Sequence, residues 1–315
     1  MRENTNFNQV RVNYIFNPGG LGDNVCRLSA LRHIAQRWEH LNALVWIPDC
    51  YAMLAEYILK DTPRIGVRPW SEMESKPKDH VDVLPGTPNP IRTHLMDQSF
   101  MWMADCLPTN SKERSYFPTT FKDVKVDHLE LPSKYAILAP LYVDKNRMFP
   151  AEAQYNLALE LESHNITPIF LGAPTYKVGK DEYYKVNGLF PPPGRFKQLD
   201  DLNILQAARV LAGATAVCGV DNGLLHLAAC TQTKIVAGYT VIDWKYRVPT
   251  RHASWGWRWY AVTPDEDLPC RFCHTQMNFV TYKEKYAGCE YDDYKCLQSI
   301  TADKFITGLR ALEVM

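Results

Sequence analysis

The sequence predicts an α/β fold of two Rossmann-like domains that face a cleft, and two observations support this prediction. Short β-rich runs alternate with helical segments of about ten residues, as expected for the strands of parallel, doubly wound sheets joined by crossover helices. This rhythm breaks in an irregular stretch at residues 108–132 and then restarts, and the length of 315 residues suits two domains of about 150 residues each. We therefore expect an N-terminal domain at residues 1–133 and a C-terminal domain at residues 134–315.

The N-terminal half contains three strand and helix pairs. Its first strand runs into a Pro-Gly-Gly turn that cannot be helical before Gly20. From Asp23 onward the spacing becomes helical, with Val25, Leu28 and Leu31 on one face. The expected strands are residues 10–16, 43–47 and 81–84, and the expected helices begin at residue 23 and cover residues 51–59 and 95–106.

The C-terminal half repeats this rhythm over more elements. Its apolar runs are short, and glycine, proline or aspartate follows most of them. The last helix carries Phe305, Ile306, Leu309 and Leu312 on one side. The expected strands are residues 135–139, 168–171, 216–220 and 234–237, and the expected helices are residues 151–163, 202–211, 221–230 and 301–312.

Composition narrows the class of protein. Thirty-five Lys and Arg balance thirty-five Asp and Glu, which argues against a generally basic nucleic-acid binder but allows a local basic patch. The sequence has no run of 18 apolar residues and no signal-peptide pattern at its start. Nine cysteines, an odd number in a chain too long to need disulfide staples, favour a reducing cytoplasm as the location.

The first turn with chemical potential follows the first strand and reads Gly19-Gly20-Leu21-Gly22-Asp23. Its glycine spacing matches neither a Walker loop nor a Gly-x-Gly-x-x-Gly motif. In doubly wound sheets ligands bind at such turns, and the missing side chains would let a ligand approach the backbone. The alternative is structural, because an aspartate at a helix start caps a backbone amide.

The second turn, Asp221-Asn222-Gly223, joins a buried strand to a helix that contains His226. Free backbone amides at a helix start form an anion site. Capping is again the alternative for the turn, and a partly buried structural residue is the alternative for the histidine. A third feature, Lys145 and Arg147 just before Pro150, could reach a phosphate or could be the charged tip of a loop.

Together these features resemble glycosyltransferase family nine, the ADP-heptose:lipopolysaccharide heptosyltransferases. The order matches: a Gly-x-Gly-Asp turn, a basic residue with aromatic-Pro, then Asp-x-Gly-Leu-x-His-Leu. Residues 208–229 are the most specific match. Arg147-Met-Phe-Pro150 looks like the family's Lys-Arg-Trp-Pro, with Arg in place of Lys. The resemblance is clear over residues 135–250, includes the first turn, and fades between residues 60 and 130, where the family contacts its acceptor.

The resemblance implies a GT-B glycosyltransferase fold, with the acceptor on the N-terminal domain and a nucleoside-diphosphate sugar donor on the C-terminal domain. It also implies an inverting transfer that needs no metal or other cofactor for catalysis. By analogy, the last helix is expected to pack back on the N-terminal domain. Asn222 stands where the family has Thr, and this departure, with the Arg147 one, means that the donor need not be ADP-heptose.

The roles implied by the resemblance fit the chemistry of the residues. Asp23 would be the general base that removes the proton of the acceptor hydroxyl. Asp221 would accept hydrogen bonds from sugar hydroxyls, and the amides of Asn222 and Gly223 would stabilise the leaving diphosphate together with a nearby cation. The donor-binding residues expected from the resemblance are Gly20, Gly22, Lys145, Arg147, Asp221, Asn222, Gly223, Leu224 and His226.

Four cysteines, Cys270, Cys273, Cys289 and Cys296, form a group near the end of the sequence. Their number permits a tetrahedral structural Zn²⁺ site, although the last two are separated by more residues than usual. Family members often carry cysteines in this region, which points to a structural role. Free buried thiols are the alternative.

A run of positive charge interleaved with aromatic residues lies between residues 244 and 260. Its basic residues are Lys245, Arg247, Arg251 and Arg258, and no acidic residue occurs between Asp243 and Asp265. Such a stretch suits a phosphorylated saccharide or a nucleic-acid strand with splayed bases. The alternative is an ordinary strand at residues 255–260, with one face in the core.

Three functions are therefore open at this point. The first is a glycosyltransferase acting on a saccharide such as a lipopolysaccharide core. The second is a phage-type DNA glycosyltransferase acting on a hydroxymethylated base, which the basic aromatic run favours and the zero net charge weakens. The third is an inactive module that binds a sugar nucleotide or a glycan, against which the retention of Asp23 argues.

Overall fold

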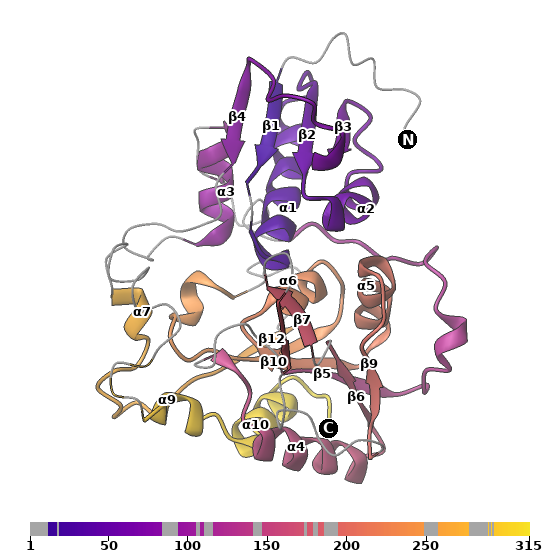
Figure 1. Cartoon of the computed structure of the whole chain (residues 1–315). Coiled ribbons are helices and arrows are strands. Elements are labelled where there is room, and N and C mark those ends of the chain that lie inside the picture. Colours follow the sequence, from indigo (N-terminus) through magenta and orange to yellow (C-terminus); the bar gives the residue numbers. More distant parts are fainter. Residues whose placement is uncertain are drawn as a thin grey trace.

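The computed structural model contains two α/β domains, stacked one above the other in Figure 1. The residues that it describes are 12–17, 19–83, 94–104, 108–109, 116–140, 147–172, 175–178, 182–185, 195–248, 258–276, 289, 291 and 293–315. Across these residues, the helices are all too short or too polar to cross a membrane.

The N-terminal domain is built on a four-stranded sheet in the order β3-β2-β1-β4, in which all strand pairs are parallel. Its strands are β1 (Val12–Phe16), β2 (Ala43–Ile47), β3 (Ile65–Pro69) and β4 (His80–Val83). Its helices are α1 (Leu21–Arg37), α2 (Asp49–Ile58) and α3 (Leu95–Ala104). The central strands β1 and β2 bury most of their residues, which explains their apolar sequences.

The C-terminal domain is built on a six-stranded parallel sheet in the order β12-β11-β10-β5-β6-β9. Its strands are β5 (Tyr135–Ala139), β6 (Thr167–Leu171), β9 (Lys197–Leu199), β10 (Ala216–Val220), β11 (Lys234–Gly238) and β12 (Trp259–Val262). Its helices are α4 (Ala151–Ser163), α5 (Ile204–Gly213), α6 (Gly223–Ala229), α7 (Cys273–Gln276), α9 (Lys295–Gln298) and α10 (Ala302–Ala311). A separate antiparallel ribbon pairs β7 (Thr175–Val178) with β8 (Glu182–Lys185).

Both sheets contain a topological switch point. This is a pair of neighbouring strands from which the chain connections lead outward in opposite directions across the sheet. In the C-terminal sheet this point lies between β5 and β10, and in the N-terminal sheet it lies between β1 and β4. The loops that leave a switch point diverge and open a crevice, which is where ligands bind in sheets of this kind. The doubly wound architecture expected from the sequence is therefore confirmed.

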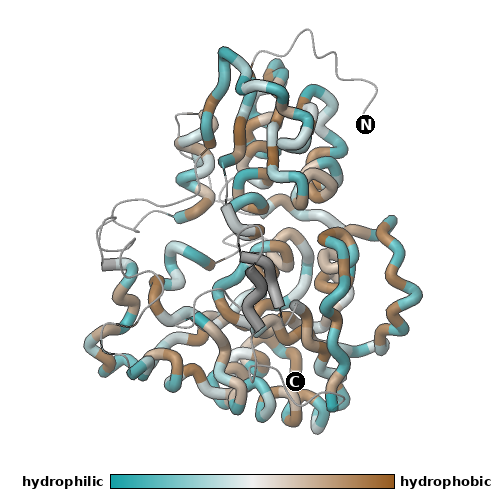
Figure 2. The backbone as a smooth tube through the Cα atoms, viewed as in Figure 1, coloured by the Kyte–Doolittle hydropathy of each residue, from teal (hydrophilic) through white to brown (hydrophobic). Residues whose placement is uncertain are grey.

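The position of the last helix corrects the expectation drawn by analogy. Among the described residues, helix α10 packs mainly against α4, β11 and β12 of its own domain, at the base of the molecule in Figure 1, rather than on the N-terminal domain. Phe305 and Leu309 are fully buried there, and the ring of Phe305 stacks on Phe149 at 4.3 Å. Hydrophobic and hydrophilic residues alternate along α4 and α10 in Figure 2, and the hydrophobic ones fill the local core.

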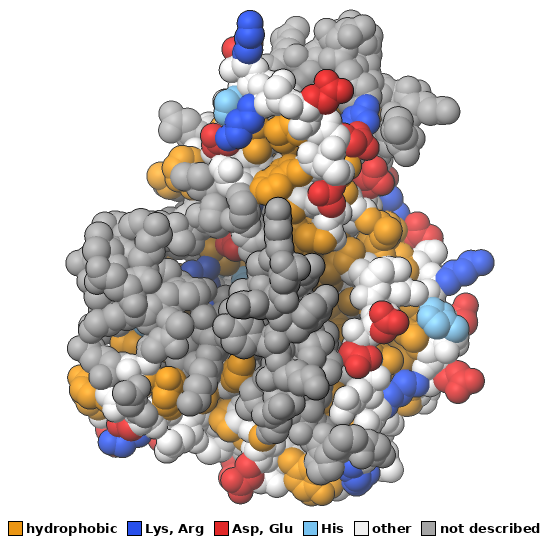
Figure 3. Space-filling model, in the orientation of Figure 1, with side chains coloured by type: hydrophobic (Ala, Val, Ile, Leu, Met, Phe, Trp, Pro, Cys, Tyr) orange, Lys and Arg blue, Asp and Glu red, His pale blue; other side chains and the backbone are white. Residues whose placement is uncertain are grey.

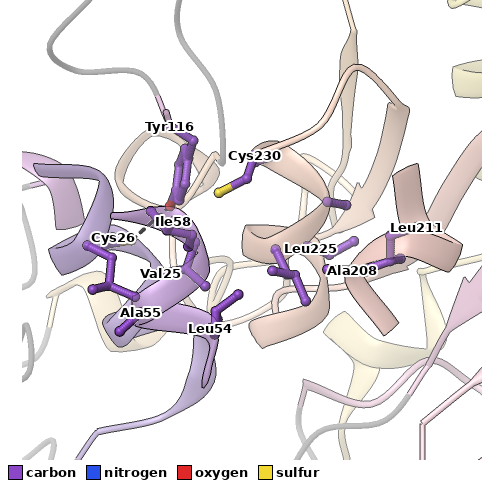
Figure 4. Packing of buried hydrophobic residues seen from close by; sticks show 14 of the residues in the cluster. Val25, Cys26, Leu54, Ala55, Ile58, Tyr116, Ala208, Leu211, Leu225 and Cys230 are labelled. Carbon is purple, nitrogen blue, oxygen red and sulfur yellow. Dashed lines mark hydrogen bonds between the residues drawn. The ribbon is translucent and has the colours of Figure 1, made fainter. Parts of the chain in front are cut away.

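The two domains share one continuous apolar core. Helices α1 and α2 of the N-terminal domain pack against α6 and α5 of the C-terminal domain. Figure 4 shows this contact, with Val25 and Leu54 on one side and Leu225 and Leu211 on the other. Tyr116, from the segment that connects the domains, is completely buried in the same cluster. This packing fixes the carboxyl edges of the two sheets relative to each other.

Candidate active site

The two turns singled out in the sequence lie in contact between the domains. Helix α1 begins after β1, helix α6 begins after β10, and the two helices pack together. A Cβ atom on Gly22 would lie 2.6 Å from Cδ2 of His226, and one on Gly223 would lie 2.5 Å from Cβ of Leu21. The glycines thus allow the two helix starts to approach each other. Basic and acidic side chains are visible in a recess between the domains in Figure 3.

Asp23 is half-buried in the first turn of α1. Its Oδ2 accepts a hydrogen bond from the backbone amide of Gly20 at 3.0 Å, which is the capping arrangement considered from the sequence. Its Oδ1 has no hydrogen-bond partner among the residues that the structure describes. One oxygen therefore holds the helix start while the other remains able to accept a proton.

Arg27 lies one turn further along α1 and is 2% exposed. Its Nη1 donates to the backbone oxygen of Asn17 at 2.8 Å and so anchors the start of the glycine turn to α1. Burial lowers the pKa of Arg27, and the negative charge of Asp23 opposes this shift. Arg27 therefore supports the turn that presents Asp23, a role that its polar position on the predicted helix did not indicate.

Arg147, Asp221 and His226 form a buried group at the switch point of the C-terminal sheet. Arg147 follows β5 and Asp221 follows β10, so the pairing of these strands brings the two side chains together. Nη2 of Arg147 donates to the backbone oxygen of Asp221 at 2.9 Å and to its carboxylate Oδ2. Nε2 of His226 lies 3.6 Å from Oδ1 of the same carboxylate.

The Asp221 carboxylate is ionised in this group. Burial alone would raise the pKa of Asp221, since the residue is only 5% exposed. The Arg147 charge, the nearby His226 imidazole and the Arg247 charge outweigh burial and hold the pKa far below its ordinary value. Asp221 is therefore a fixed acceptor for hydroxyl or amide donors.

Asn222 caps helix α6. Its Oδ1 accepts from the amides of Leu224 at 3.0 Å and Leu225 at 3.2 Å, and its Nδ2 donates to the backbone oxygen of Ala139 at 2.9 Å. The capping interpretation is thus confirmed for this side chain. The backbone amide of Gly223 has no acceptor within the described part of the chain, so it remains available to an anion.

The structure separates the basic residues that the sequence had grouped. Arg247 follows β11, which pairs in parallel with β10, and its positive charge acts on Asp221, Tyr239 and Cys26. Arg258 precedes β12 and therefore lies at the amino ends of the strands, whereas Arg247 follows a carboxyl end. Nη1 of Arg258 donates there to the backbone oxygen of Gln232 at 3.2 Å. Lys245 is exposed beside Arg247. Lys145 and Arg251 lie outside the described residues.

Tyr116 and Cys26 complete the site, and no motif in the sequence marked either residue. The Tyr116 hydroxyl lies 2.5 Å from Nδ1 of His226 and 2.9 Å from Sγ of Cys26. Only the docking of the domains brings this tyrosine of an irregular linker to the histidine of α6 and to the cysteine of α1.

The four C-terminal cysteines are close enough to influence one another. Burial raises the pKa of Cys273 to about 11, and the thiols of Cys270 and Cys289 add to this shift. Burial raises the pKa of Cys296 to about 12, with contributions from all three of the others. None of the four forms a disulfide. Within the described residues, no group of three or more His, Cys, Asp or Glu has the arrangement of a metal site.

Comparison with known families identifies the chain. The family model of glycosyltransferase family 9 (heptosyltransferase) matches residues 90–261, more than half of the chain. The chain belongs to glycosyltransferase family 9. The matched region of this glycosyltransferase includes Tyr116, Arg147, Asp221, His226 and Arg247, whereas Asp23 and the four cysteines lie outside it. No curated protein sequence matches the chain.

Solved structures of similar fold agree with this family. TibC, a dodecameric iron-containing glycosyltransferase from enterotoxigenic E. coli, has a TM-score of 0.71 at 13% identity, over 96% of this chain and 76% of TibC. E. coli ADP-heptose LPS heptosyltransferase II has a TM-score of 0.62 at 13% identity, over 95% of this chain and 98% of that one. A family 9 protein from Veillonella parvula has a TM-score of 0.65 at 12% identity, over 96% of both chains. These likenesses show the GT-B fold that the sequence predicted.

Proposed function

We propose that this family 9 enzyme is an inverting glycosyltransferase that moves a sugar from a nucleoside-diphosphate sugar to a hydroxyl of a saccharide, without a catalytic metal. One observation carries the proposal. The contact between Gly22 and His226 brings a half-buried carboxylate, Asp23, to the edge of a site built around the ionised Asp221. A base and a polar donor site thus face each other across the domain boundary.

In the proposed reaction the acceptor oxygen attacks the anomeric carbon while the bond from that carbon to the diphosphate breaks. Asp23 takes the acceptor proton on Oδ1, because Oδ2 is bonded to the Gly20 amide. Attack from the face opposite the leaving group inverts the anomeric configuration. The nucleoside diphosphate leaves with the electron pair, so positive groups must stabilise it.

The donor side supplies groups for the sugar and for the diphosphate. Asp221 accepts hydrogen bonds from the sugar hydroxyls, and the Gly223 amide donates to the diphosphate. Arg147 is engaged with Asp221, so Arg247 is the described cation that we assign to the diphosphate. One related structure holds TibC in complex with ADP-D-β-D-heptose, which makes ADP-heptose the first donor to test.

The saccharide acceptor is preferred over DNA because of where the basic residues lie. The DNA hypothesis rested on an unbroken basic run. In the structure, Arg247 follows the carboxyl end of β11, whereas Arg258 lies at the amino end of the parallel strand β12. A continuous surface for a phosphate backbone needs clustered cations. Gel retardation of hydroxymethylated DNA that falls steeply with salt would reverse this preference.

Thermal unfolding with a panel of ADP, UDP, GDP, CDP and their sugars tests the donor site. A ligand at 100 times its Kd stabilises the folded protein by about 2.7 kcal/mol, which raises the melting temperature by a few degrees. We expect one nucleotide to give this shift with the wild type and with Arg258→Gln, and to lose most of it with Arg247→Gln. If no nucleotide shifts the wild type, or if both variants respond alike, the donor assignment is wrong.

We also propose that Cys270, Cys273, Cys289 and Cys296 hold a structural metal ion, Zn²⁺ or iron. Their four thiols act on one another electrostatically and form no disulfide, and thiolates are the usual ligands of tetrahedral sites of both metals. As they lie, the four do not have the arrangement of a metal site, so binding of the ion would have to draw the thiols together. TibC, which shares the fold, is described as iron-containing. The ion would tie the α7 and α9 segments together and take no part in the transfer.

Metal analysis of the purified protein tests this second proposal. We expect about one ion per chain in the wild type and a large loss in Cys273→Ser. Cys50→Ser changes an exposed cysteine on α2 and serves as the matched control, which should keep its metal. A wild type without stoichiometric metal, or a Cys273→Ser variant that retains it, would contradict the proposal.

A further inference from the structure

A chain of hydrogen-bonding groups crosses the domain boundary and ends at the donor site. It runs from Cys26 on α1 to Tyr116 in the linker and then to His226 on α6, whose Nε2 faces the Asp221 carboxylate at 3.6 Å. Figure 4 shows the first step, with the Tyr116 ring standing above α1 and its hydroxyl joined to Cys26. All four residues are buried. Groups in such a position must share their protons in a defined order.

The charge at Asp221 sets that order. An ionised carboxylate only accepts, so it favours a hydrogen on Nε2 of His226, which faces Oδ1 of Asp221 across 3.6 Å, but at this distance it does not fix the tautomer by itself. In a neutral imidazole the other nitrogen, Nδ1, then has to accept. The Tyr116 hydroxyl lies 2.5 Å from Nδ1, and burial raises the pKa of Tyr116 well above its ordinary value, so this hydroxyl keeps its proton and donates it to the hydrogen bond.

Cys26 fits the same direction. Since the Tyr116 proton points to His226, the Tyr116 oxygen is left to accept from the Cys26 thiol at 2.9 Å. Burial raises the pKa of Cys26, which keeps this thiol protonated as a donor. The resulting order is that Cys26 donates to Tyr116, Tyr116 donates to His226, and the N–H on Nε2 of His226 faces Asp221 at 3.6 Å.

The position of the imidazole is fixed as well as its tautomer. The ring lies against the first turn of α1, where a Cβ on Gly22 would come within 2.6 Å of Cδ2. Gly22 and Tyr116 therefore limit the ring from two directions, and the Gly22 side belongs to the N-terminal domain. The geometry of the donor-binding carboxylate thus depends on the docking of the other domain.

From this arrangement we propose that Tyr116 is a positioning residue. Its hydroxyl donates to Nδ1 and so holds the His226 imidazole in the tautomer with its hydrogen on Nε2, whose N–H faces Asp221. The carboxylate is then held by Arg147 at Oδ2 and by His226 at Oδ1, and it meets the donor sugar in one orientation. The effect of this orientation on the donor sugar rests on the proposed function, whereas the assignment of the His226 tautomer does not.

The variant Tyr116→Phe removes the hydroxyl and keeps the ring. Without the donor at Nδ1, the imidazole is free to place its proton there, and Nε2 would then turn a lone pair toward the Asp221 carboxylate. The matched control is Tyr135→Phe, which removes another buried tyrosine hydroxyl, bonded to the backbone oxygen of Val210 at 2.8 Å, in the core of the C-terminal domain. It separates the effect of the tautomer from that of any lost buried hydrogen bond.

Nitrogen NMR of protein labelled with ¹⁵N-histidine reads the tautomer directly at neutral pH, and His226→Asn assigns the signal. We expect a protonated Nε2 and an unprotonated Nδ1 in the wild type and in Tyr135→Phe, and a mixture of tautomers in Tyr116→Phe. A wild-type signal with Nδ1 protonated, or a Tyr116→Phe spectrum identical to the wild type, would overturn the proposal.

Binding of the nucleotide sugar selected by the unfolding panel gives the functional readout. Tyr116→Phe should weaken binding by up to about tenfold, which is the upper end of what one ordinary hydrogen bond contributes, while Tyr135→Phe should not. Unchanged affinity in Tyr116→Phe would overturn the positioning role. If no nucleotide sugar binds the wild type, the proposed function fails, and the NMR result alone decides on the tautomer.

Discussion

Removal of the Arg147 guanidinium should destabilise the folded protein strongly, since it leaves the Asp221 carboxylate buried without its main partner. Arg147 and Asp221 are 6% and 5% exposed, and the guanidinium bonds both the carboxylate and the backbone oxygen of Asp221. Breaking a buried pair by removal of one partner costs about 3–5 kcal/mol. We therefore expect Arg147→Met to lower the free energy of unfolding by about 3 kcal/mol or more at pH 7.

The loss depends on pH in a defined direction. The pKa of Asp221 is lowered in the folded state, so its contribution to stability is present above the pKa of about 3.9 in the unfolded chain and is lost as the pH falls below it. In Arg147→Met much of this contribution is missing already. The difference between wild type and variant should therefore be largest near neutrality and should narrow below about pH 4.

Urea unfolding followed by the fluorescence of the eight tryptophans measures both effects. Asp221→Asn and the double variant complete a double-mutant cycle, in which the double variant should be more stable than Arg147→Met. Arg195→Met is the control, because Arg195 pairs with Glu162 on the surface and its loss should change little. An Arg147→Met protein as stable as the wild type, or a difference that widens in acid, would refute the reasoning.

Three further predictions concern packing. Gly22→Ala should lower the free energy of unfolding by about 1–3 kcal/mol, because its Cβ would lie 2.6 Å from His226. Gly20→Ala is the control and should be tolerated, since the nearest atom to its Cβ is 3.8 Å away. Equal melting temperatures of the two variants would contradict this prediction. Asn222→Ala should lose about 1 kcal/mol of helix capping, and Asn222→Ser should recover part of it in the same unfolding assay. Phe305→Ala should cost about 3–5 kcal/mol if α10 belongs to the C-terminal core, and a surface-like loss below about 1 kcal/mol would place the helix elsewhere.

The sequence predicted best the elements that are buried on both sides. Strands β5 (Tyr135–Ala139) and β10 (Ala216–Val220) begin and end where the apolar runs do, because both strands are central and every residue is buried. Strand β3 (Ile65–Pro69) was missed, since it lies at the sheet edge and contains Gly66, Arg68 and Pro69. An edge strand needs no continuous apolar run, so its sequence resembles a loop.

The candidate site was predictable where local chemistry marks it. The turns at Gly20–Asp23 and Asp221–Gly223 stood out by composition, and they do lie together. The choice between capping and chemistry was not an exclusive one, because Asp23 caps with one oxygen and leaves the other open. Tyr116 could not be predicted, because its hydrogen bond to His226 joins residues 110 positions apart and depends on how the domains dock.

The central claim is that Asp23 is the general base that takes the proton of the acceptor hydroxyl as this hydroxyl attacks the donor sugar held by the C-terminal domain. Its most direct test compares wild type and Asp23→Asn, which keeps an oxygen to accept from the Gly20 amide, in donor binding and in release of nucleoside diphosphate with a glycan acceptor. We predict unchanged donor affinity and turnover reduced about 100-fold or more in the variant, as expected for loss of a general base. Equal turnover in the two proteins would contradict the account.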